Sequence, residues 1–526
     1  MSNQPQLKIT YKLKLGVIII CAGLCLSVLS SASQIANLGK GVASLTWGVG
    51  ISFCVLGTLI LPRHRSVGVL STLFSLAGSN LFRGVLYGAD TIKSVLLVRQ
   101  VLDGAWYGTP LSHVYFATIY QVTGAGFFRG VMLGVTAALI PFGLSVIYWV
   151  RRVTPNQYIS FALLGILTNW FLIEFHTFAA KETIGLPLAI YTGTILLKAF
   201  DRHEVRLIIL ATLFSFALVL AHHLSALIPL LIVTATFLIA IVRSTPLRSR
   251  LIPNNQWIIH PWVLLIFVLI VGGYWTLVFD QVYSLGLTPV VHELIGVSAP
   301  EQAQIQSPSI INSGQQTIYQ VFQLNWRGWK VMLFAPVIII GGLYRAVSQR
   351  QVFNNYQEFI LAFGSAALAV GVLAVFTTYT VASGWRFINF AWLFIIPLFI
   401  LIYKDISPEM VVKIIIALFI VLNVIAWPAA NIDPTTTSPL SHDEWAFNEG
   451  DVSISLFTVE YGKHPYTISG SAGGMMYYFS TLGKYPYNSV NPCDLNYTIG
   501  REIASNETSD KIYTNGYWVS QLNQCN

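Results

Sequence analysis

Long apolar runs separated by short polar segments dominate the pattern of this 526-residue chain. Most of these runs approach the ~20 residues that a helix needs to cross the hydrocarbon core of a bilayer. By that criterion we count about thirteen runs, at 15–35, 45–61, 67–87, 127–150, 158–175, 185–200, 207–221, 226–242, 262–279, 331–343, 359–378, 388–403 and 411–430. The pattern therefore predicts a polytopic α-helical membrane protein.

The composition belongs to the same class. Hydrophobic residues make up 55% of the chain, charged residues 10%, and the mean hydropathy is +0.65. A soluble protein would carry about 25% charged residues. The formal net charge of +8 does not indicate a nucleic-acid partner, because Lys and Arg fall in short clusters between the apolar runs. We expect these clusters to set the orientation of the chain in a lipid bilayer.

Positive charge marks the cytoplasmic side of a membrane protein. Lys8, Lys12 and Lys14 precede a first run that is long enough to span and lacks a small-residue cleavage pattern, so we expect no cleavable signal peptide and a cytoplasmic N-terminus. Alternation from there places the basic clusters at 63–65, 151–152, 201–206 and 243–250 inside the cell. The basic residues that face outward on this topology are Lys181, Arg327, Lys330 and Arg386.

Region 431–526 reads as a separate soluble domain outside the cytoplasm, after a membrane domain at 1–430. It is rich in Tyr, Ser, Asn and Gly, with strand-like pieces at 452–459 and 511–513 and a predicted helix at 474–481, so we expect an α/β or mainly β fold. Two glycosylation sequons begin at Asn496 and Asn506.

The five cysteines divide between the two regions. Cys21, Cys25 and Cys54 lie inside apolar runs, where we expect reduced, buried side chains. Cys493 and Cys525 lie in the polar C-terminal region and predict a disulfide if that region is extracytoplasmic.

The stretch 86–121 is the most polar interruption of the early membrane region. Asp90 is placed to act as the N-cap of an amphipathic helix at 91–103 that lies flat on the membrane surface, and Gly104 is placed to end it. A capping carboxylate stays ionised, which is also what a general base requires. The structural and the chemical reading of Asp90 are therefore compatible.

Further polar residues reach the same face. Glu182 is either a surface partner of Lys181 at a helix start or a second acid facing Asp90, and His176 could belong with it. His222 and His223 end a span and point different ways, so at least one of them is expected to be an interfacial cap. No zinc spacing is present. A divalent cation, Mg²⁺ or Mn²⁺, held by Asp90 and Glu182 stays an open alternative to a site with no metal.

Outward-facing basic residues suggest contacts with phosphate. Arg386, between two apolar runs, is either an anchor to lipid headgroups or a clamp on the phosphate of a lipid-linked substrate. Arg327 and Lys330, amid Trp326 and Trp329, indicate a further headgroup contact or an aromatic belt. No nucleotide-binding or kinase motif occurs in the chain. A transferase on the outer face would therefore need an activated donor carried by the membrane.

Several short motifs resemble those of the GT-C glycosyltransferases, integral membrane enzymes that use polyprenyl-phosphate-linked sugars. They are Tyr87-Gly88-Ala89-Asp90 in the early outer loop, 102–106 (LDGAW), 221–225 (AHHLS), 384–387 (GWRF) and 510–516 (DKIYTNG), the last three similar to segments of archaeal members.

The resemblance implies a GT-C-like fold and a catalytic acid at Asp90, with Glu182 as the second outer-loop acid. Asp90 would deprotonate the acceptor hydroxyl and the reaction would invert the sugar. The expected partners are a polyprenyl- or dolichyl-phosphate sugar and a glycan or glycoprotein acceptor. The residues expected to bind substrate or lipid phosphate are Arg386, Lys181, His222, His223, His176 and Arg99.

Three other classes stay open at this point. A secondary transporter would show repeated halves and a site at midplane. A membrane glycan ligase or polymerase would differ in donor or acceptor. A surface scaffold would leave the outer-loop acids unexplained.

Overall fold

The computed structural model describes residues 4–35, 40–61, 65–78, 86–87, 89–104, 110–169, 179–222, 225–244, 261–277, 326, 329–330, 332–341, 381–426, 446–447, 466–468, 497–501, 509–514 and 518–523. This part of the chain is mainly helical. Its helices are α1 (Gln4–Ile35), α2 (Lys40–Ile60), α3 (Arg65–Leu73), π-helical η1 (Phe74–Gly78), α5 (Ala89–Leu102), α6 (Leu111–Thr123), α7 (Phe127–Val153), 3₁₀-helical η2 (Asn156–Tyr158), α8 (Ile159–Leu167), α10 (Glu182–Arg202), α11 (Val205–Ala221), α12 (Leu227–Ser244), α14 (Pro261–Leu277), α18 (Val381–Tyr403) and α19 (Glu409–Ala426). A further helical stretch is Met332–Gly341.

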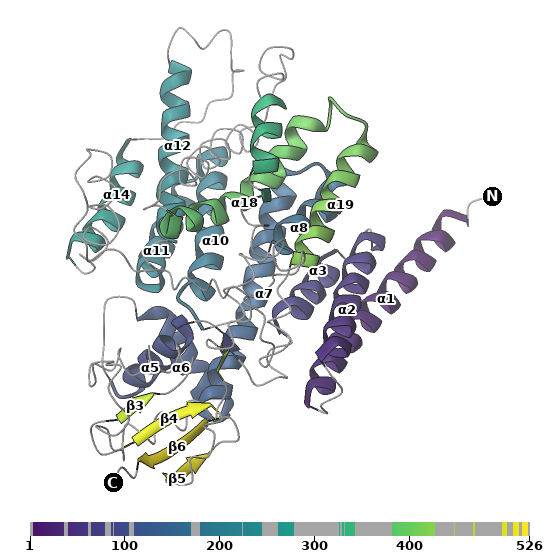
Figure 1. Cartoon of the computed structure of the whole chain (residues 1–526). Coiled ribbons are helices and arrows are strands. Elements are labelled where there is room, and N and C mark those ends of the chain that lie inside the picture. The colour runs from purple at the N-terminus through teal and green to yellow at the C-terminus, as the bar shows by residue number, and fades with distance from the viewer. Residues whose placement is uncertain are drawn as a thin grey trace.

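The long helices form a bundle with the short helices α5 and α6 at its lower end (Figure 1). α1 packs along α2 at one side of the bundle, and α10 packs on α7, α11 and α12 near its middle. α10 and α11 run in opposite directions, since residues at the start of α10 meet the residue that follows α11. The two ends of this α10–α11 hairpin therefore lie at opposite ends of the bundle.

Among the described residues three helices are long and apolar enough to cross a membrane, namely Tyr11–Ser30, Arg129–Val153 and Glu182–Arg202. Shorter apolar helices fall in most of the other predicted runs. The helical, membrane-compatible class predicted from the sequence is confirmed at this level. Run 67–87 is shorter than expected, because Leu86–Tyr87 is a strand, β1. Run 359–378 lies outside the described residues.

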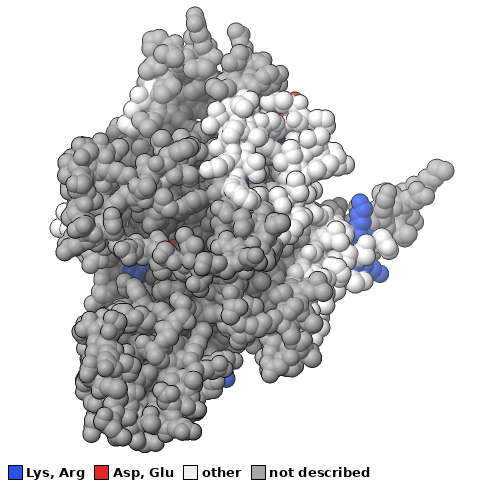
Figure 2. Space-filling model, viewed as in Figure 1, with Lys and Arg blue, Asp and Glu red and all other residues white. Residues whose placement is uncertain are grey.

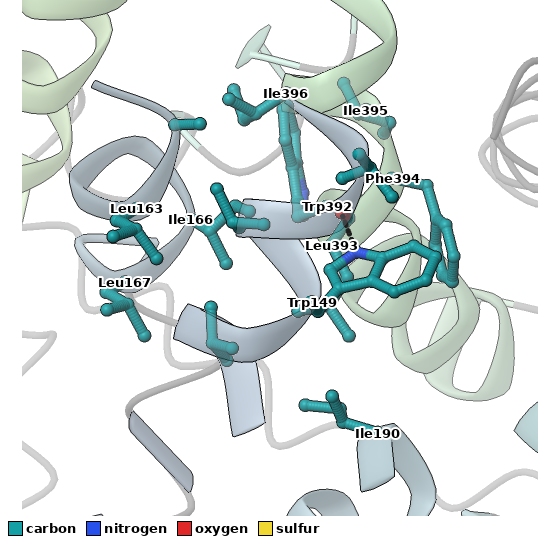
Figure 3. Close-up of a cluster of buried hydrophobic side chains, with 14 of the residues drawn as sticks. Trp149, Leu163, Ile166, Leu167, Ile190, Trp392, Leu393, Phe394, Ile395 and Ile396 are labelled. Atoms are coloured by element: carbon teal, nitrogen blue, oxygen red, sulfur yellow. Dashed lines mark hydrogen bonds between the residues drawn. The ribbon is translucent and has the colours of Figure 1, made fainter. Parts of the chain in front are cut away.

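Buried aromatic and aliphatic side chains from α7, α8, α10 and α18 hold the middle of the bundle together (Figure 3). The indole Nε1–H of Trp149 donates to the main-chain carbonyl of Leu393 over 3.3 Å, and the Trp149 ring meets Phe394 edge to face. Such contacts are needed inside a membrane, where lipid is as apolar as the core and helices associate through packing and hydrogen bonds. The cluster thus fixes α7 against α18.

Apolar side chains also cover much of the outer surface. On α11 the exposed large residues recur at helical spacing, as Val205, Ile209, Leu213, Phe216 and Leu220. In the view of Figure 2 the described surface over α19 is almost free of charge, and Lys and Arg gather along α1. Exposed apolar side chains of this kind suit contact with lipid.

The three cysteines of the apolar runs are free. Cys54 is buried as predicted, but the side chains of Cys21 and Cys25 are exposed. The expectation of burial was wrong for these two because they lie on faces of α1 that do not pack against α2.

Strands occur in the C-terminal region. The remaining strands are β2 (Ala446–Phe447), β3 (Tyr466–Ile468), β4 (Tyr497–Arg501), β5 (Ser509–Thr514) and β6 (Trp518–Asn523). β3 to β6 form one sheet in the order β3-β4-β6-β5, with β3 parallel to β4 and the other pairs antiparallel. The predicted strand at 511–513 lies in β5, whereas 452–459 and 474–481 lie outside the described residues.

One strand pair joins the C-terminal region to the stretch 86–121. Leu86 pairs with Phe447 and Tyr87 with Ala446 in an antiparallel ladder. The chain reaches α5, the helix that holds Asp90, two residues after this pair. The segment leading into that helix is therefore bonded to the region after α19.

Candidate functional site

Two of the residues predicted for the outer face meet inside the protein. Glu182 lies in the first turn of α10, and His222 directly follows α11. His222 Nε2 lies 3.2 Å from Glu182 Oε1, and the two side chains are only 3% and 8% exposed. The alternative of a solvent-exposed partner for Lys181 is wrong for Glu182, because its side chain is directed into the packed end of the bundle.

The surroundings of His222 determine which of its nitrogens carries the proton. The main-chain N–H of Ser225 donates to His222 Nδ1 over 3.2 Å, and the Ser225 hydroxyl lies 2.7 Å from the same nitrogen. An amide can only donate, so Nδ1 is the acceptor of the ring and Nε2 carries the hydrogen. His222 therefore donates from Nε2 to the Glu182 carboxylate.

A glycine makes this approach possible. Gly185 lies one helical turn after Glu182 and faces the same neighbours. A Cβ at Gly185 would come within 2.5 Å of His222 Cβ and 3.2 Å of Ser225 Oγ. Any larger residue would push the His222–Ser225 turn away from α10. Gly185 thus sets the distance between the carboxylate and the imidazole.

Helix dipoles favour the same arrangement. The N-terminus of a helix favours a negative charge and the C-terminus favours a donor or a positive charge. Glu182 occupies the first turn of α10, and His222 caps α11 through a main-chain bond to Leu218. The pair therefore joins the positive end of one helix to the negative end of its neighbour.

A serine ties the early loop to this pair. Ser112, in the first turn of α6, is fully buried and its hydroxyl lies 3.1 Å from both the Lys181 and the Ala221 carbonyl oxygens. These carbonyls belong to the residues directly before Glu182 and His222. A single hydroxyl proton shared between the two acceptors holds the start of α10 and the end of α11 against α6.

The Asp90 helix packs on α6. The sequence predicted Asp90 as the N-cap of this helix, but α5 begins at Ala89, so Asp90 lies in its first turn. The side chain of Asp90 lies outside the described residues. Gly104 follows the helix with φ +84°, a conformation that favours glycine, at the predicted stop. Val95 and Val98 are buried and Arg99 is exposed, which agrees with an amphipathic helix.

The other predicted site residues are not brought to the pair by what the structure describes. Lys181 is half-buried at the N-cap of α10. Arg386 lies in α18, but its side chain is outside the described residues, as are His176, His223, Asn496, Asn506, Cys493 and Cys525 entirely. Their roles stay predictions.

Three members of the site had no assigned role in the sequence analysis. Ser112, Gly185 and Ser225 carry no ionisable group, so the pattern of charged residues along the chain does not point to them. Two sequence features could have indicated them: Ser225 lies three residues after His222 and precedes a helix, and Gly185 lies one turn after Glu182.

The described residues contain no group of three His, Cys, Asp or Glu side chains that could hold a metal ion. Glu182 and His222 supply two potential ligands, with the His222 nitrogen nearest the acid already protonated. The pair as it stands is therefore built as a hydrogen-bonded acid and imidazole.

Comparisons with known proteins add no relative. No protein-family model matches the chain, and no curated protein matches it in sequence.

Proposed function

We propose that the protein is a membrane glycosyltransferase that moves a sugar from a polyprenyl- or dolichyl-phosphate-linked donor to a glycan or glycoprotein acceptor on the outer face. In this proposal about thirteen helices cross the cell membrane, the N-terminus is cytoplasmic, and 431–526 is an extracytoplasmic domain. That domain would hold the Cys493–Cys525 disulfide and the glycosylation sites Asn496 and Asn506.

The observation that carries the proposal is the bonding of Ser112 in α6 to the main-chain carbonyls of the residues next to Glu182 and His222. α6 belongs to the same stretch, 86–121, as the Asp90 helix, and Ser112 joins it to the residues next to Glu182 and His222. Segments far apart in sequence, each assigned to the outer face, thus share one buried hydrogen-bonded site. The convergence of an acid-bearing loop with an oriented carboxylate is what a transferase at that face would need.

The position of the pair favours an enzyme over a transporter. Glu182 is in the first turn of α10 and His222 follows the last residue of α11. A transporter site would lie near the middle of the membrane helices, where substrate can be reached from both sides. A pair at the helix ends instead lies close to one membrane surface, on the side of the proposed Asp90 chemistry.

The proposed reaction follows from the residue types. The Asp90 carboxylate accepts the proton of the acceptor hydroxyl, whose oxygen attacks the anomeric carbon. The bond from that carbon to the phosphate oxygen breaks, its electron pair stays on the lipid phosphate, and the configuration inverts. Arg386 stabilises the charge that develops on the phosphate. Glu182, held in one orientation by His222, positions the acceptor.

The test is transfer by membranes that contain the full chain or an Asp90→Asn variant, with tritium-labelled dolichyl-phosphate mannose and glucose as donors. Loss of a general base costs about 10²- to 10⁴-fold in rate, so we expect transfer by Asp90→Asn to fall by that factor. Asp103→Asn, which changes the exposed acid just after the same helix, is the matched control and should stay active. Equal rates for wild type and Asp90→Asn would contradict the proposal.

A further inference from the structure

The π-helical turn that follows α3 is held by two side chains of α2. Trp47 Nε1 donates to the main-chain carbonyl of Ser75 in η1 over 3.0 Å, and the Ser75 hydroxyl lies 3.2 Å from Cys54 Sγ. All three residues are buried. A π-helical turn is wider than an α-helical one and is commonly found at functional sites. The contacts with α2 therefore fix a turn of unusual geometry.

α2 is a firm base for these contacts because it packs very closely on α1. A Cβ on Gly23 would lie 2.6 Å from the Gly50 carbonyl oxygen, and a Cβ on Gly57 would lie 2.9 Å from the Gly16 carbonyl oxygen. Two helix backbones approach this closely only where side chains are missing, and such packing is a main source of helix association inside a membrane. The helix from which the two side chains extend is thus fixed itself.

α3 is clamped as well, so it cannot turn freely about its own axis. On the α2 side a Cβ on Gly68 would lie 2.9 Å from Thr58 Cα, and on the α7 side a Cβ on Gly143 would lie 2.7 Å from Leu73 Cδ1. With α3 held from both sides, the turn at its end sets the direction in which the chain leaves it. An α-helical turn in place of η1 would send the chain in another direction, because the two kinds of turn contain different numbers of residues.

The next described element after η1 is strand β1, and its pairing is short. Leu86 faces Phe447, and Tyr87 faces Ala446. The helix α5, which holds Asp90, follows directly. Two residue pairs contain few hydrogen bonds, so the ladder alone fixes its register weakly. A slip by one residue would turn the side chains of β1 to the other face and move the start of α5 along β2. The path of the chain before β1 therefore contributes to the register.

We propose that Trp47 is a positioning residue for the stretch 86–121. By holding the π-helical turn, it sets the register in which Leu86 pairs with Phe447, and this register places Asp90. Trp47 acts through the chain that it orients and takes no part in a reaction itself. Its effect on the strand register is independent of the proposed function, whereas its effect on catalysis rests on that function. The two effects are measured separately.

The register is measured by disulfide formation between pairs of introduced cysteines in the full-length protein in membranes. Facing residues of an antiparallel pair have Cα atoms about 4.5–5.5 Å apart, within the range that a disulfide spans. Leu86→Cys with Phe447→Cys reports the native register. Leu86→Cys with Ala446→Cys or with Asn448→Cys reports a slip by one residue in either direction. Mass spectrometry of the linked peptides after oxidation gives the rate for each pair, and the ratio of native to slipped disulfide gives the register.

Trp47→Phe keeps an aromatic ring and removes the N–H that holds Ser75. The loss of this hydrogen bond should lower the ratio of native to slipped disulfide about twofold to tenfold. Trp149→Phe is the matched control, because its N–H also bonds a main-chain carbonyl, that of Leu393, but between α7 and α18. We expect the control to keep the wild-type ratio. An unchanged ratio in Trp47→Phe overturns the inference, and so does an equal fall in both variants, which would indicate general loosening of the bundle.

Sugar transfer tests the catalytic part of the inference. Trp47→Phe should lower kcat for the labelled donor and leave KM unchanged, because fewer molecules place Asp90 correctly and each binds the donor as before. Closing the disulfide between positions 86 and 447 should restore kcat to that of the equally linked wild type. A wild-type kcat despite a lower disulfide ratio overturns the catalytic part, as does a failure of the disulfide to restore it. If the wild type itself transfers no sugar, the proposed function fails, and the disulfide ratio alone decides the role of Trp47.

Discussion

The two ends of the α10–α11 hairpin carry similar residues in opposite environments. At one end Glu182 bonds His222, with side chains 8% and 3% exposed. At the other end Glu204 accepts from Arg206 Nε over 3.0 Å and lies 3.8 Å from Arg202, with the two arginines mostly exposed. An acid thus meets a basic residue at both ends, but only one pair is removed from solvent.

The difference shows at which end of the hairpin a charged side chain affects the stability of the fold. Exposed ion pairs contribute little, because water already solvates both partners. The hydrogen bond from Arg206 lowers the pKa of the Glu204 carboxyl, and the pair simply keeps the turn charged on the predicted cytoplasmic side. Glu182 and His222 are buried away from water and hydrogen-bond to each other instead, so each depends on its partner. We therefore expect substitutions at the two ends to differ sharply.

The largest effect is expected for His222→Ala. This change leaves the Glu182 carboxylate buried without its imidazole donor, which costs about 3–5 kcal/mol for a buried pair that loses one member. The measurement is the free energy of unfolding in detergent. The control is His203→Gly at the exposed end of the hairpin, where φ is +55° and glycine fits. Equal losses from the two changes would mean that the ends do not differ.

A smaller effect is expected for Gly185→Ala. The new methyl group would lie 2.5 Å from His222 Cβ, and overpacking of this kind costs about 1–3 kcal/mol. Gly273→Ala in α14 is the matched control, because a Cβ there meets no atom within 4 Å. Unfolding midpoints of the two variants should move in opposite directions, the control upward. A stabilised Gly185→Ala would show that His222 is not held close to α10.

The smallest effect is expected for Glu204→Gln. Because its pKa is lowered in the folded protein, the Glu204 carboxylate stabilises the fold above its ordinary pKa, and this contribution is lost as pH falls through the lowered value. Between pH 6 and 8 this contribution is fully present, but it is small because water solvates both partners of the exposed pair, so the unfolding midpoint of the variant should stay within experimental error of the wild type. A clear drop that persists at high salt would mean that the exposed turn matters as much as the buried pair.

Most of the helical architecture could be predicted from the chain alone. Apolar runs located most of the helices because hydrophobicity over 20 residues is a local property. Positive charge also placed Glu182 and His222 on the same side, and they lie in contact. The pairing itself needs the close antiparallel packing of α10 on α11. That packing is possible because Gly185 has no side chain.

Other features could not be predicted so readily. α6 was not predicted, although Pro110 precedes it and Gly124 ends it in a left-handed conformation. The burial of Lys330 depends on Asn169, which is distant in sequence, and no local pattern reports such a partner. The same holds for β1 and β2, which are two residues each and have no strand-like periodicity.

The pairing of β1 with β2 also sets an order of assembly. Leu86 and Phe447 are partners that are separated by most of the chain. At a synthesis rate of about 5–20 residues per second, the ribosome needs roughly 20–70 s between the two. During that interval the start of the Asp90 helix has no strand to bind. The stretch 86–121 can therefore reach its final hydrogen bonding only late in biosynthesis, after α19 has been made.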